Sequence, residues 1–381
     1  HPDNPEFQAA KAKGIPMMPR ADLLGEMMRN YKHAVNISGT HGKTTTTSML
    51  TEILLAADAD PTITVGGILP AIGGNIRVGG PEFFVAEACE YTNSFLSFFP
   101  TLEIILNIEA DHLDFFKDLE DIRHSFRLFA QKLDENGVLI INRDIERMEE
   151  ITEGLPCKVI TFGKDPEKSI YSAADIVFDQ LARASYTLLI EGRPEGTITL
   201  GVPGMHNVYN SLSAIAASRE LGISMEKIRT GLLHFTGTNR RFEKKGEIGG
   251  VTVIDDYAHH PQEIRATLTT AKNYPHKKLW CVFQPHTYTR TAALLDDFVQ
   301  ALMEADEVIL ADIYAAREVN TIGISSADVA ERIQAAGGKA HYIPSFDDIE
   351  TFILENCVPG DLLITMGAGD IVKVGEKLLG L

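Results

Sequence analysis

The sequence predicts an α/β protein whose sheets are mainly parallel. Short apolar runs alternate with helical patterns along most of the 381 residues, and that alternation is typical of parallel strands joined by helices. The pattern changes between residues 170 and 200, where two runs look like the strands of a hairpin. A second alternating series begins at GGVTV, residues 249–253. Two α/β units, the first carrying a β insertion, are therefore expected.

The elements of the first unit follow from its apolar runs. AVNIS precedes the helical TTTTSMLTEILLAA, FFVAEA stands alone, LEIILNI precedes LEDIRHSFRLFAQKL, and GVLIIN precedes a polar helix. YTLLIEG and GTITLGV are expected to pair around the turn residues Gly192 and Pro194. One helical stretch is then expected from His206 to about Phe235.

The second unit and the N-terminal segment set the expected domain limits. LWCVFQPH, EVILADIY, KAHYIP and DLLITMG are the later strands of the second series, separated by helices such as SSADVAERIQAAGG. The first 33 residues offer only a helix, a short GIPMM strand and another helix, too little for a domain. We expect the remnant of an N-terminal domain at 1–33, a central domain at 34–236 and a C-terminal domain at 237–381.

Composition excludes several classes of function. A hydrophobic content of 44% supplies an ample core, and a formal charge of −18 argues against a nucleic-acid surface. The four cysteines are far apart and form no C-x-x-C pair, which favours reduced cytoplasmic thiols over disulfides or a zinc site. No apolar run approaches the roughly 20 residues that span a bilayer. We expect a cytoplasmic protein without a membrane segment, and the oligomeric state is not predicted.

The stretch GTHGKTTTTS, residues 39–48, indicates a phosphate-binding loop between a strand and a helix. Glycines let backbone N–H groups face phosphates, and the helix N-terminus adds a positive dipole. Lys43 would reach the β and γ phosphates, and the Thr44 hydroxyl would bind Mg²⁺. The spacing is shorter than G-x-x-x-x-G-K-[ST], so an ordinary glycine turn capped by Thr40 is the alternative.

Acidic residues follow two buried strands and could complete a magnesium site. Carboxyl ends of parallel strands are where open α/β sheets bind ligands, and Mg²⁺ prefers oxygen donors. Solvated charges at strand ends are the alternative explanation. The residues are Glu87 and Glu90 after the first strand, and Glu109, Asp111, His112 and Asp114 after the second.

Eight motifs together resemble a known family. They are GTHGKTTT at 39–46, EACE at 87–90, NIEADH at 107–112, PGMHNVYN at 203–210, RRFE at 240–243, DDYAHHP at 255–261, FQPHTYTRT at 283–291 and MGAGDI at 366–371. In this order they resemble the Mur ligases, ATP-dependent amino-acid ligases of peptidoglycan precursor synthesis. The last two narrow the resemblance to the subgroup that joins L-alanine to UDP-N-acetylmuramate.

The resemblance implies three domains: a UDP-binding N-terminal domain, largely missing here, a P-loop-type ATPase and a Rossmann-like C-terminal domain. It also implies roles for single residues. ATP would be bound by Gly39, Thr40, His41, Gly42, Lys43, Thr44, Thr45, Asn207, Asn210, Arg241 and Asp256, and Mg²⁺ by Thr44, Glu87 and His112. The substrates would be bound by Glu90, Tyr257, His259, His286 and Arg290, with Lys43, His259 and Arg290 catalytic. Whether His41 touches the nucleotide or only fills the turn is open.

Four positions depart from the pattern of this family or of its sister ligases. Many members have acids where this chain has Cys89 and Thr92, and some have Arg at Thr287. Sister ligases use a carbamylated lysine where HSFRLFA offers only Arg127, whose guanidinium does not take that modification. No residue is therefore assigned to that role.

The implied reaction is amide formation driven by ATP through an acyl phosphate. The lactyl carboxylate of UDP-N-acetylmuramate takes the γ-phosphate, and the amine of L-alanine displaces it. Alternatives are the ligase that joins a tripeptide to the same sugar, folylpolyglutamate synthase, and a non-catalytic nucleotide-binding module. DDYAHHP and FQPHTYTRT favour the alanine-adding subgroup over the two other ligases, and a nucleotide-binding module would have no need of the C-terminal histidine and arginine motifs.

Overall fold

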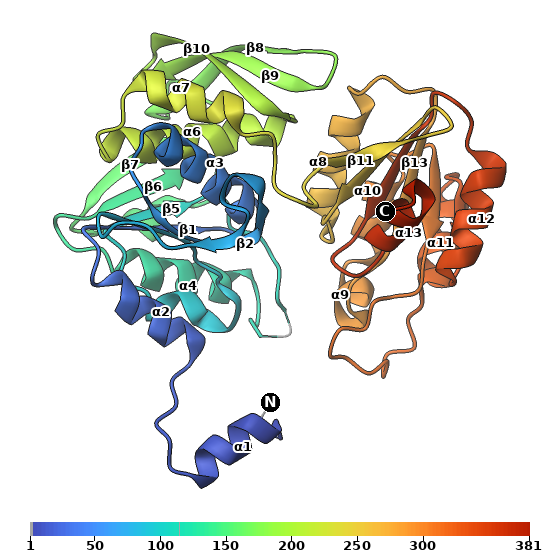
Figure 1. Ribbon diagram of the computed structural model, residues 1–381, viewed down its shortest axis with the longest axis horizontal. Helices are drawn as coiled ribbons and strands as arrows, with labels where there is room; N and C mark the ends of the chain where they lie inside the picture. The colour runs from blue at the N-terminus through green and yellow to red at the C-terminus, as the bar shows by residue number, and fades with distance from the viewer. Residues whose placement is uncertain (1–2, 114) are drawn as a thin grey trace.

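The computed structural model describes residues 3–113 and 115–381 and contains two sheets, as the sequence predicts (Figure 1). Asp114 lies outside the described residues. A ten-stranded sheet occupies the N-terminal part, and a six-stranded sheet lies beside it in the C-terminal part. The α/β fold class and the mainly parallel first sheet are confirmed.

The larger sheet has the order β10-β9-β8-β7-β6-β5-β1-β4-β2-β3. Its strands are β1 (His33–Ser38), β2 (Thr62–Leu69), β3 (Gly74–Arg77), β4 (Phe83–Glu87), β5 (Leu102–Ile105), β6 (Val138–Asn142), β7 (Lys158–Phe162), β8 (Tyr171–Phe178), β9 (Arg183–Ile190) and β10 (Arg193–Pro203). The strands from β2 through β8 in that order are parallel, while β3, β9 and β10 pair antiparallel.

The predicted hairpin exists, with two corrections. β9 and β10 pair antiparallel around Glu191 and Gly192, but Pro194 lies inside β10 opposite Leu189. A proline is tolerated there because β10 is the edge strand and needs no donor on its outer side. Through β8 the hairpin also continues the main sheet, so the inserted strands extend it.

Helices cover both faces of the larger sheet. On one face are α3 (Lys43–Ala56), α6 (Met205–Glu220) and α7 (Met225–His234), and on the other are α2 (Arg20–Met28) and α4 (Leu119–Ala130), with α5 (Glu149–Thr152) packed on α4. Val35 and Ile37 of β1 are buried in the core under α3, α6 and α7, and Ala34 is buried in the core under α2 and α4. Burial on both faces explains why the strand sequences are almost wholly apolar.

Two predicted elements differ from the structure. The helix expected from His206 to Phe235 is two helices, because Gly222 adopts φ +78° after α6. GIPMM forms no strand: residues 15–18 follow α1 (Pro5–Ala12), which buries no residue, and they are exposed. A strand requires a partner for its backbone, and this segment runs along no sheet.

The smaller sheet has the order β11-β12-β16-β13-β14-β15, with only β11 antiparallel. Its strands are β11 (Glu243–Ile248), β12 (Val251–Asp256), β13 (Leu279–Phe283), β14 (Glu307–Leu310), β15 (Ala340–Tyr342) and β16 (Leu362–Met366). The helices are α8 (Pro261–Lys272), α9 (Tyr288–Ala293), α10 (Leu295–Leu302), α11 (Ser326–Ala335), α12 (Phe346–Asn356) and α13 (Val372–Leu379). α8, α10 and α11 cover one face, and α12 and α13 the other.

The predicted domain limits remain predictions. Residue 34 lies at the start of β1, and residue 237 lies between α7 and β11, where the chain passes from one sheet to the other. None of the helices among the described residues combines the length and the apolar character that crossing a membrane requires.

Candidate active site

The predicted phosphate loop follows β1, and the chain continues from β1 to strands on both sides of it in the larger sheet. β1 is flanked by β4 and β5, both parallel to it, so the carboxyl ends of all three strands meet at one edge. Open α/β sheets bind ligands at this point because the loops diverge and leave room. The acidic motifs that follow β4 and β5 are thereby brought beside the loop that follows β1.

Both glycines of the loop are required by its shape. Gly39 has φ +136° and Gly42 has φ +86°, values that favour glycine. A Cβ on Gly42 would stand 2.7 Å from Oδ1 of Asn210, and one on Gly39 would stand 3.0 Å from Cβ of Leu106. The short spacing between the two glycines is thus a tight turn packed against β5 and α6.

The loop is held from β5 by backbone and side-chain bonds. The Asn107 side chain accepts from the His41 amide at 2.8 Å and donates to the His41 carbonyl at 3.0 Å. The Thr40 hydroxyl accepts from the Glu109 amide at 2.9 Å. Thr40 and Asn107 therefore shape the loop.

Lys43, the first residue of α3, folds back over the loop. Its Nζ donates to the carbonyls of Gly39 and Thr40 and lies 3.1 Å from Oε2 of Glu90, which is 2% exposed. Burial alone would lower the pKa of Lys43, but Glu90 raises it above its ordinary value. The lysine thus stays charged where phosphates are expected, and Glu90 acts first as its counter-ion.

Thr44 and Glu87 both lie beside the two adjacent glycines of β2, Gly66 and Gly67. The Gly66 amide donates to Oε1 of Glu87 at 2.5 Å, and a Cβ on Gly67 would stand 3.2 Å from Cγ2 of Thr44. A hydroxyl at a helix N-terminus beside a carboxylate is a donor set that fits Mg²⁺ with nucleotide phosphates. Thr45 follows Thr44 and is partly exposed. The sequence argument missed Gly66 and Gly67, although a paired glycine inside a strand signals close approach.

His112 lies elsewhere on the same edge. It adopts φ +54°, and its ring packs at a tilt against that of Tyr91, with 4.6 Å between ring centroids. Its Nε2 is 3.8 Å from Oδ2 of Asp111. Within the described part of the chain we find no contact that joins His112 to Thr44 or Glu87, so its metal role stays a prediction.

Arg290, in α9 of the C-terminal part, reaches across to Asp111, which follows β5 of the central part. Its Nη2 lies 3.0 Å from Oδ1 of Asp111, and its Nη1 lies 3.3 Å from Nδ1 of His286. Burial alone would raise the pKa of Asp111, but Arg290 holds it well below its ordinary range. His286 in turn packs on Tyr314 and on His259, with ring centroids 5.5 Å and 5.9 Å apart.

Glu263 is the residue of this interface that the sequence argument missed. It accepts from the His259 amide at 3.0 Å, and its Oε1 lies 3.1 Å from Nδ1 of His41. Burial alone would lower the pKa of His41, but Glu263 and Glu109 raise it to about 9. The available signal was the HPQE run, because Glu263 closes a capping box with His260 at the start of α8.

His259 is held as a neutral ring. Its Nδ1 lies 3.1 Å from the Tyr257 carbonyl and 3.3 Å from Oε2 of Glu263. Both neighbours are acceptors, so Nδ1 carries the proton and Nε2 keeps a lone pair. Burial lowers the pKa of His259 to about 4, which keeps it neutral near pH 7.

The predicted adenine and ribose residues make internal bonds. Asn207 donates to the Pro203 carbonyl at 2.7 Å, and Asn210 donates to Oδ1 of Asn207 at 3.0 Å. Asp256 accepts from the amides of Phe242 and Ala258 at 2.8 and 2.7 Å, and burial raises its pKa to about 6.

A cavity of about 330 Å³ lies beside these residues, bordered by Pro203, Thr238, Arg241 and Phe242. Arg241 lies over the Tyr257 ring, 5.2 Å from its centroid. The neighbouring Arg240 also lies over that ring, at 4.9 Å, but it bonds Asp255 and the carbonyls of Gly367 and Gly369. Of these two neighbouring arginines, Arg241 is the one that borders the cavity, which Arg183 of β9 also lines. The nucleotide roles of these residues stay predictions.

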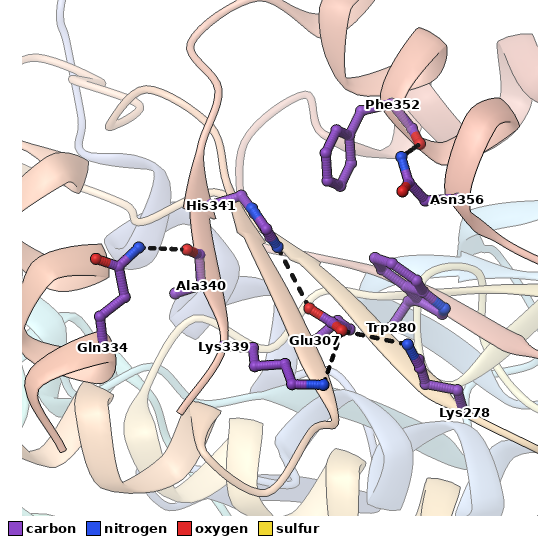
Figure 2. A pocket seen from close by; sticks show the side chains of 9 residues that line it. All are labelled: Lys278, Trp280, Glu307, Gln334, Lys339, Ala340, His341, Phe352 and Asn356. Atoms are coloured by element: carbon purple, nitrogen blue, oxygen red, sulfur yellow. Dashed lines mark hydrogen bonds and ion pairs between the residues drawn. The ribbon is translucent and has the colours of Figure 1, made fainter. Parts of the chain in front are cut away.

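A second cavity, about 380 Å³, lies at the opposite ends of β13, β14 and β15 (Figure 2). Glu307 is its buried acid, and Lys278, Lys339 and His341 surround it at 3.2, 3.4 and 3.3 Å. These charges satisfy one another at the amino ends of the strands. None of the predicted site residues lines this cavity, so it is not the active-site candidate.

Comparison with known proteins identifies the family. Residues 37–218 match the model of the Mur ligase middle domain, and residues 240–369 match that of the Mur ligase glutamate ligase domain. A relative from Lachnospira eligens is 66% identical over 379 residues, covering 100% of this chain and 83% of its own length. The chain belongs to the Mur ligase family.

Individual Mur ligases resemble it to different degrees. The Lachnospira eligens protein is named UDP-N-acetylmuramate–L-alanine ligase, as is one from Agathobacter rectalis that is 60% identical and covers 100% of this chain and 82% of its own. The crystal structure of the UDP-N-acetylmuramate–alanine ligase from Thermotoga maritima has a TM-score of 0.84 at 28% identity, covering 100% of this chain and 82% of that one. A murein peptide ligase from Psychrobacter arcticus has a TM-score of 0.73 at 25% identity, covering 100% and 83%.

The departures from the Mur ligase pattern lie at different distances from the site. Cys89 precedes Glu90 and is exposed, and Thr92 has φ +55°. Thr287 precedes α9 with φ +67°, next to His286. Arg127 donates to the carbonyls of Glu150 and Glu153 beside α5, so it is occupied away from the phosphate loop.

Proposed function

We propose that this chain is the ligase that joins L-alanine to the lactyl carboxylate of UDP-N-acetylmuramate, using ATP and Mg²⁺, in the cytoplasm. One observation carries the proposal: Arg290, His286 and His259 face the phosphate-loop side of the molecule, with Arg290 already paired to a carboxylate, that of Asp111. An arginine that binds Asp111 at 3.0 Å is suited to an amino-acid carboxylate. The relatives named for this reaction support the same conclusion.

On the nucleotide side, the chain would act by positioning and by neutralising charge. Lys43 would leave the Gly39 and Thr40 carbonyls for the γ-phosphate, while the amides of residues 39–45 hold the phosphates. Thr44 and Glu87 would hold Mg²⁺, which neutralises the phosphate charge when bound. The carboxylate of the sugar substrate would then attack the γ-phosphorus. The bond from that phosphorus to the β–γ bridging oxygen breaks, ADP leaves, and an acyl phosphate forms.

On the alanine side, Arg290 would release Asp111 and bind the alanine carboxylate. Nε2 of His259, which keeps its lone pair, would orient the amine or accept its proton. The amine then attacks the acyl carbon, the C–O bond to phosphate breaks, and phosphate leaves. No covalent bond to the enzyme is needed.

The experiment is a substrate screen with the full chain, ATP, Mg²⁺ and UDP-N-acetylmuramate, offering L-alanine, the tripeptide or glutamate separately. We expect phosphate release and a UDP-sugar amide with L-alanine. Product only with the tripeptide would identify the ligase that joins a tripeptide to this sugar. Addition of glutamate to a folate, offered in a parallel assay, would identify folylpolyglutamate synthase. ATP hydrolysis without either substrate, or none at all, would favour a non-catalytic nucleotide-binding module.

A further inference from the structure

Three buried polar atoms meet between the phosphate loop and α8. They are Nε2 of His41, Oε2 of Glu109 and Nε2 of His260. One possible ligand atom from each of these three residues lies within 4.8 Å of those from the other two. Each is buried and none makes a well-formed hydrogen bond among the described residues, although Nε2 of His41 and Oε2 of Glu109 form an ion pair at 3.2 Å when His41 is protonated. Buried polar atoms normally have a partner, so three such atoms facing one point call for an occupant.

We infer that His41, Glu109 and His260 form a binding site for a divalent transition-metal ion of the Zn²⁺ class. Two imidazole nitrogens and one carboxylate, with a water in the fourth position, are a donor set that Zn²⁺ uses in proteins. Nitrogen donors favour such an ion over Mg²⁺, which takes oxygen ligands. The site is therefore distinct from the one proposed at Thr44 and Glu87.

The distances between the candidate ligand atoms are close to those around a tetrahedral metal ion. Ligand atoms about 2 Å from a tetrahedral ion stand roughly 3.4 Å apart. Nε2 of His41 and Oε2 of Glu109 are 3.2 Å apart, and the His41 and His260 rings have centroids 4.8 Å apart. A small rotation of the His260 ring, which is 5% exposed, would complete the set.

Glu263 supplies the outer support that metal-binding histidines usually have. Its Oε1 lies 3.1 Å from Nδ1 of His41, so Nδ1 keeps its proton, and Nε2, which faces inward, would release its own proton when an ion binds. For Nε2 of His260 to bind an ion, the proton of this ring must be on Nδ1. Nδ1 then no longer accepts from the Gln262 amide, a contact that is already long at 3.5 Å. A bound ion would join the phosphate loop to the first turn of α8, and so link the two domains.

The test measures metal binding by the full chain without nucleotide or substrate, so its outcome is independent of the ligase activity. The chelator-treated protein is titrated with Zn²⁺ against a chromophoric indicator, and with Co²⁺ while its visible absorption is recorded. We expect one equivalent per chain and a Co²⁺ band typical of four or five ligands. Absence of stoichiometric binding would overturn the inference and leave water as the occupant.

Substitutions at the proposed ligands test whether the ion binds at this site. Glu109→Gln, which keeps the side-chain shape, and His260→Gln should each weaken Zn²⁺ binding at least about tenfold, because losing an outer partner alone typically costs 10–100-fold. His124→Gln, an exposed histidine on α4, and Cys89→Ser should leave it unchanged. Thermal melts verify folding of each variant. Unchanged affinity in folded Glu109→Gln, or loss in Cys89→Ser alone, would place the ion elsewhere and refute the site.

Discussion

The phosphate loop and the histidine–arginine cluster face one another but are assembled in different ways. The loop belongs to one strand–helix unit, and its polar atoms are bonded mainly within the central domain, by Asn107, Glu90 and its own carbonyls. The cluster depends on pairs between domains: Arg290 with Asp111, and Glu263 with His41. Changes in the loop should therefore act on chemistry, and changes in the cluster on domain contact as well.

The largest effect is expected at the loop, from Lys43→Ala. Removing the buried cation leaves the developing phosphate charge without its neutralising partner, so ATP-dependent phosphate release should fall by about 1,000-fold. The fold should persist at a lower stability, because the α3 backbone is unchanged while buried Glu90 loses its counter-ion. A phosphate-release assay and a thermal melt measure the two quantities.

Lys32→Ala is the matched control, since Lys32 is an exposed lysine at the other end of β1, paired with Glu82. It should change neither activity nor stability appreciably. Retained turnover in Lys43→Ala would contradict the assignment of the loop.

The next effect is expected in the cluster, from Arg290→Ala. This change removes the carboxylate partner and leaves Asp111 buried alone, so it should lower both alanine affinity and stability, each by about 2–5 kcal/mol. The alanine KM and the unfolding midpoint in urea are the measurements.

Arg317→Ala tests whether losing any arginine that contacts the other domain has the same effect on stability and on the alanine KM. Nη2 of Arg317 donates to the Tyr91 hydroxyl at 2.8 Å, but this contact is exposed. Its loss should cost little. If Arg290→Ala lowered stability with an unchanged alanine KM, the arginine would serve domain contact only.

A third prediction uses pH to separate the two regions. The raised pKa of His41, about 9 against an ordinary value of 6.5, means that its charge stabilises the folded state. That contribution is fully present below pH 6.5 and is lost as pH rises to 9, about 3 kcal/mol in all. Urea unfolding of the wild type across this window should show the decrease.

His41→Asn should abolish most of that slope. His259, with its pKa lowered to about 4, and Asp256, with its pKa raised to about 6, both titrate below pH 6.5. Neither therefore changes the free energy of unfolding between pH 6.5 and 9. A slope that persisted in His41→Asn would show that Glu263 and Glu109 do not hold a charged His41.

The smallest effect is expected from Gly42→Ala, which strains the loop without removing a functional group. A side chain at φ +86° costs about 1–3 kcal/mol, and its Cβ would crowd Asn210. Stability should fall by that amount and the ATP KM should rise.

Gly73→Ala provides the comparison, because Gly73 also has positive φ, +64°, but a Cβ there meets nothing within 4 Å. It should show the conformational cost without the crowding. Equal effects in the two variants would show that contact with Asn210 is unimportant to the loop.

The sequence by itself determined the local features of this protein. The alternation of apolar runs predicted the α/β class, and GTHGKTTTTS predicted a strand, a tight turn and a helix with Lys43 at its start, because these depend on neighbours in the chain. Elements without a local signal were mistaken: GIPMM has the composition of a strand but no partner, and the long helix after His206 breaks at Gly222.

Only the tertiary structure decided which distant groups meet. Asp111 and Arg290 are 179 positions apart, and His41 and Glu263 are 222 apart. Their pairing depends on how two sheets pack, and no periodicity or spacing in the chain records it. The charge states that follow, a protonated His41 and a neutral His259, come from burial and from carboxylates that folding alone brings near.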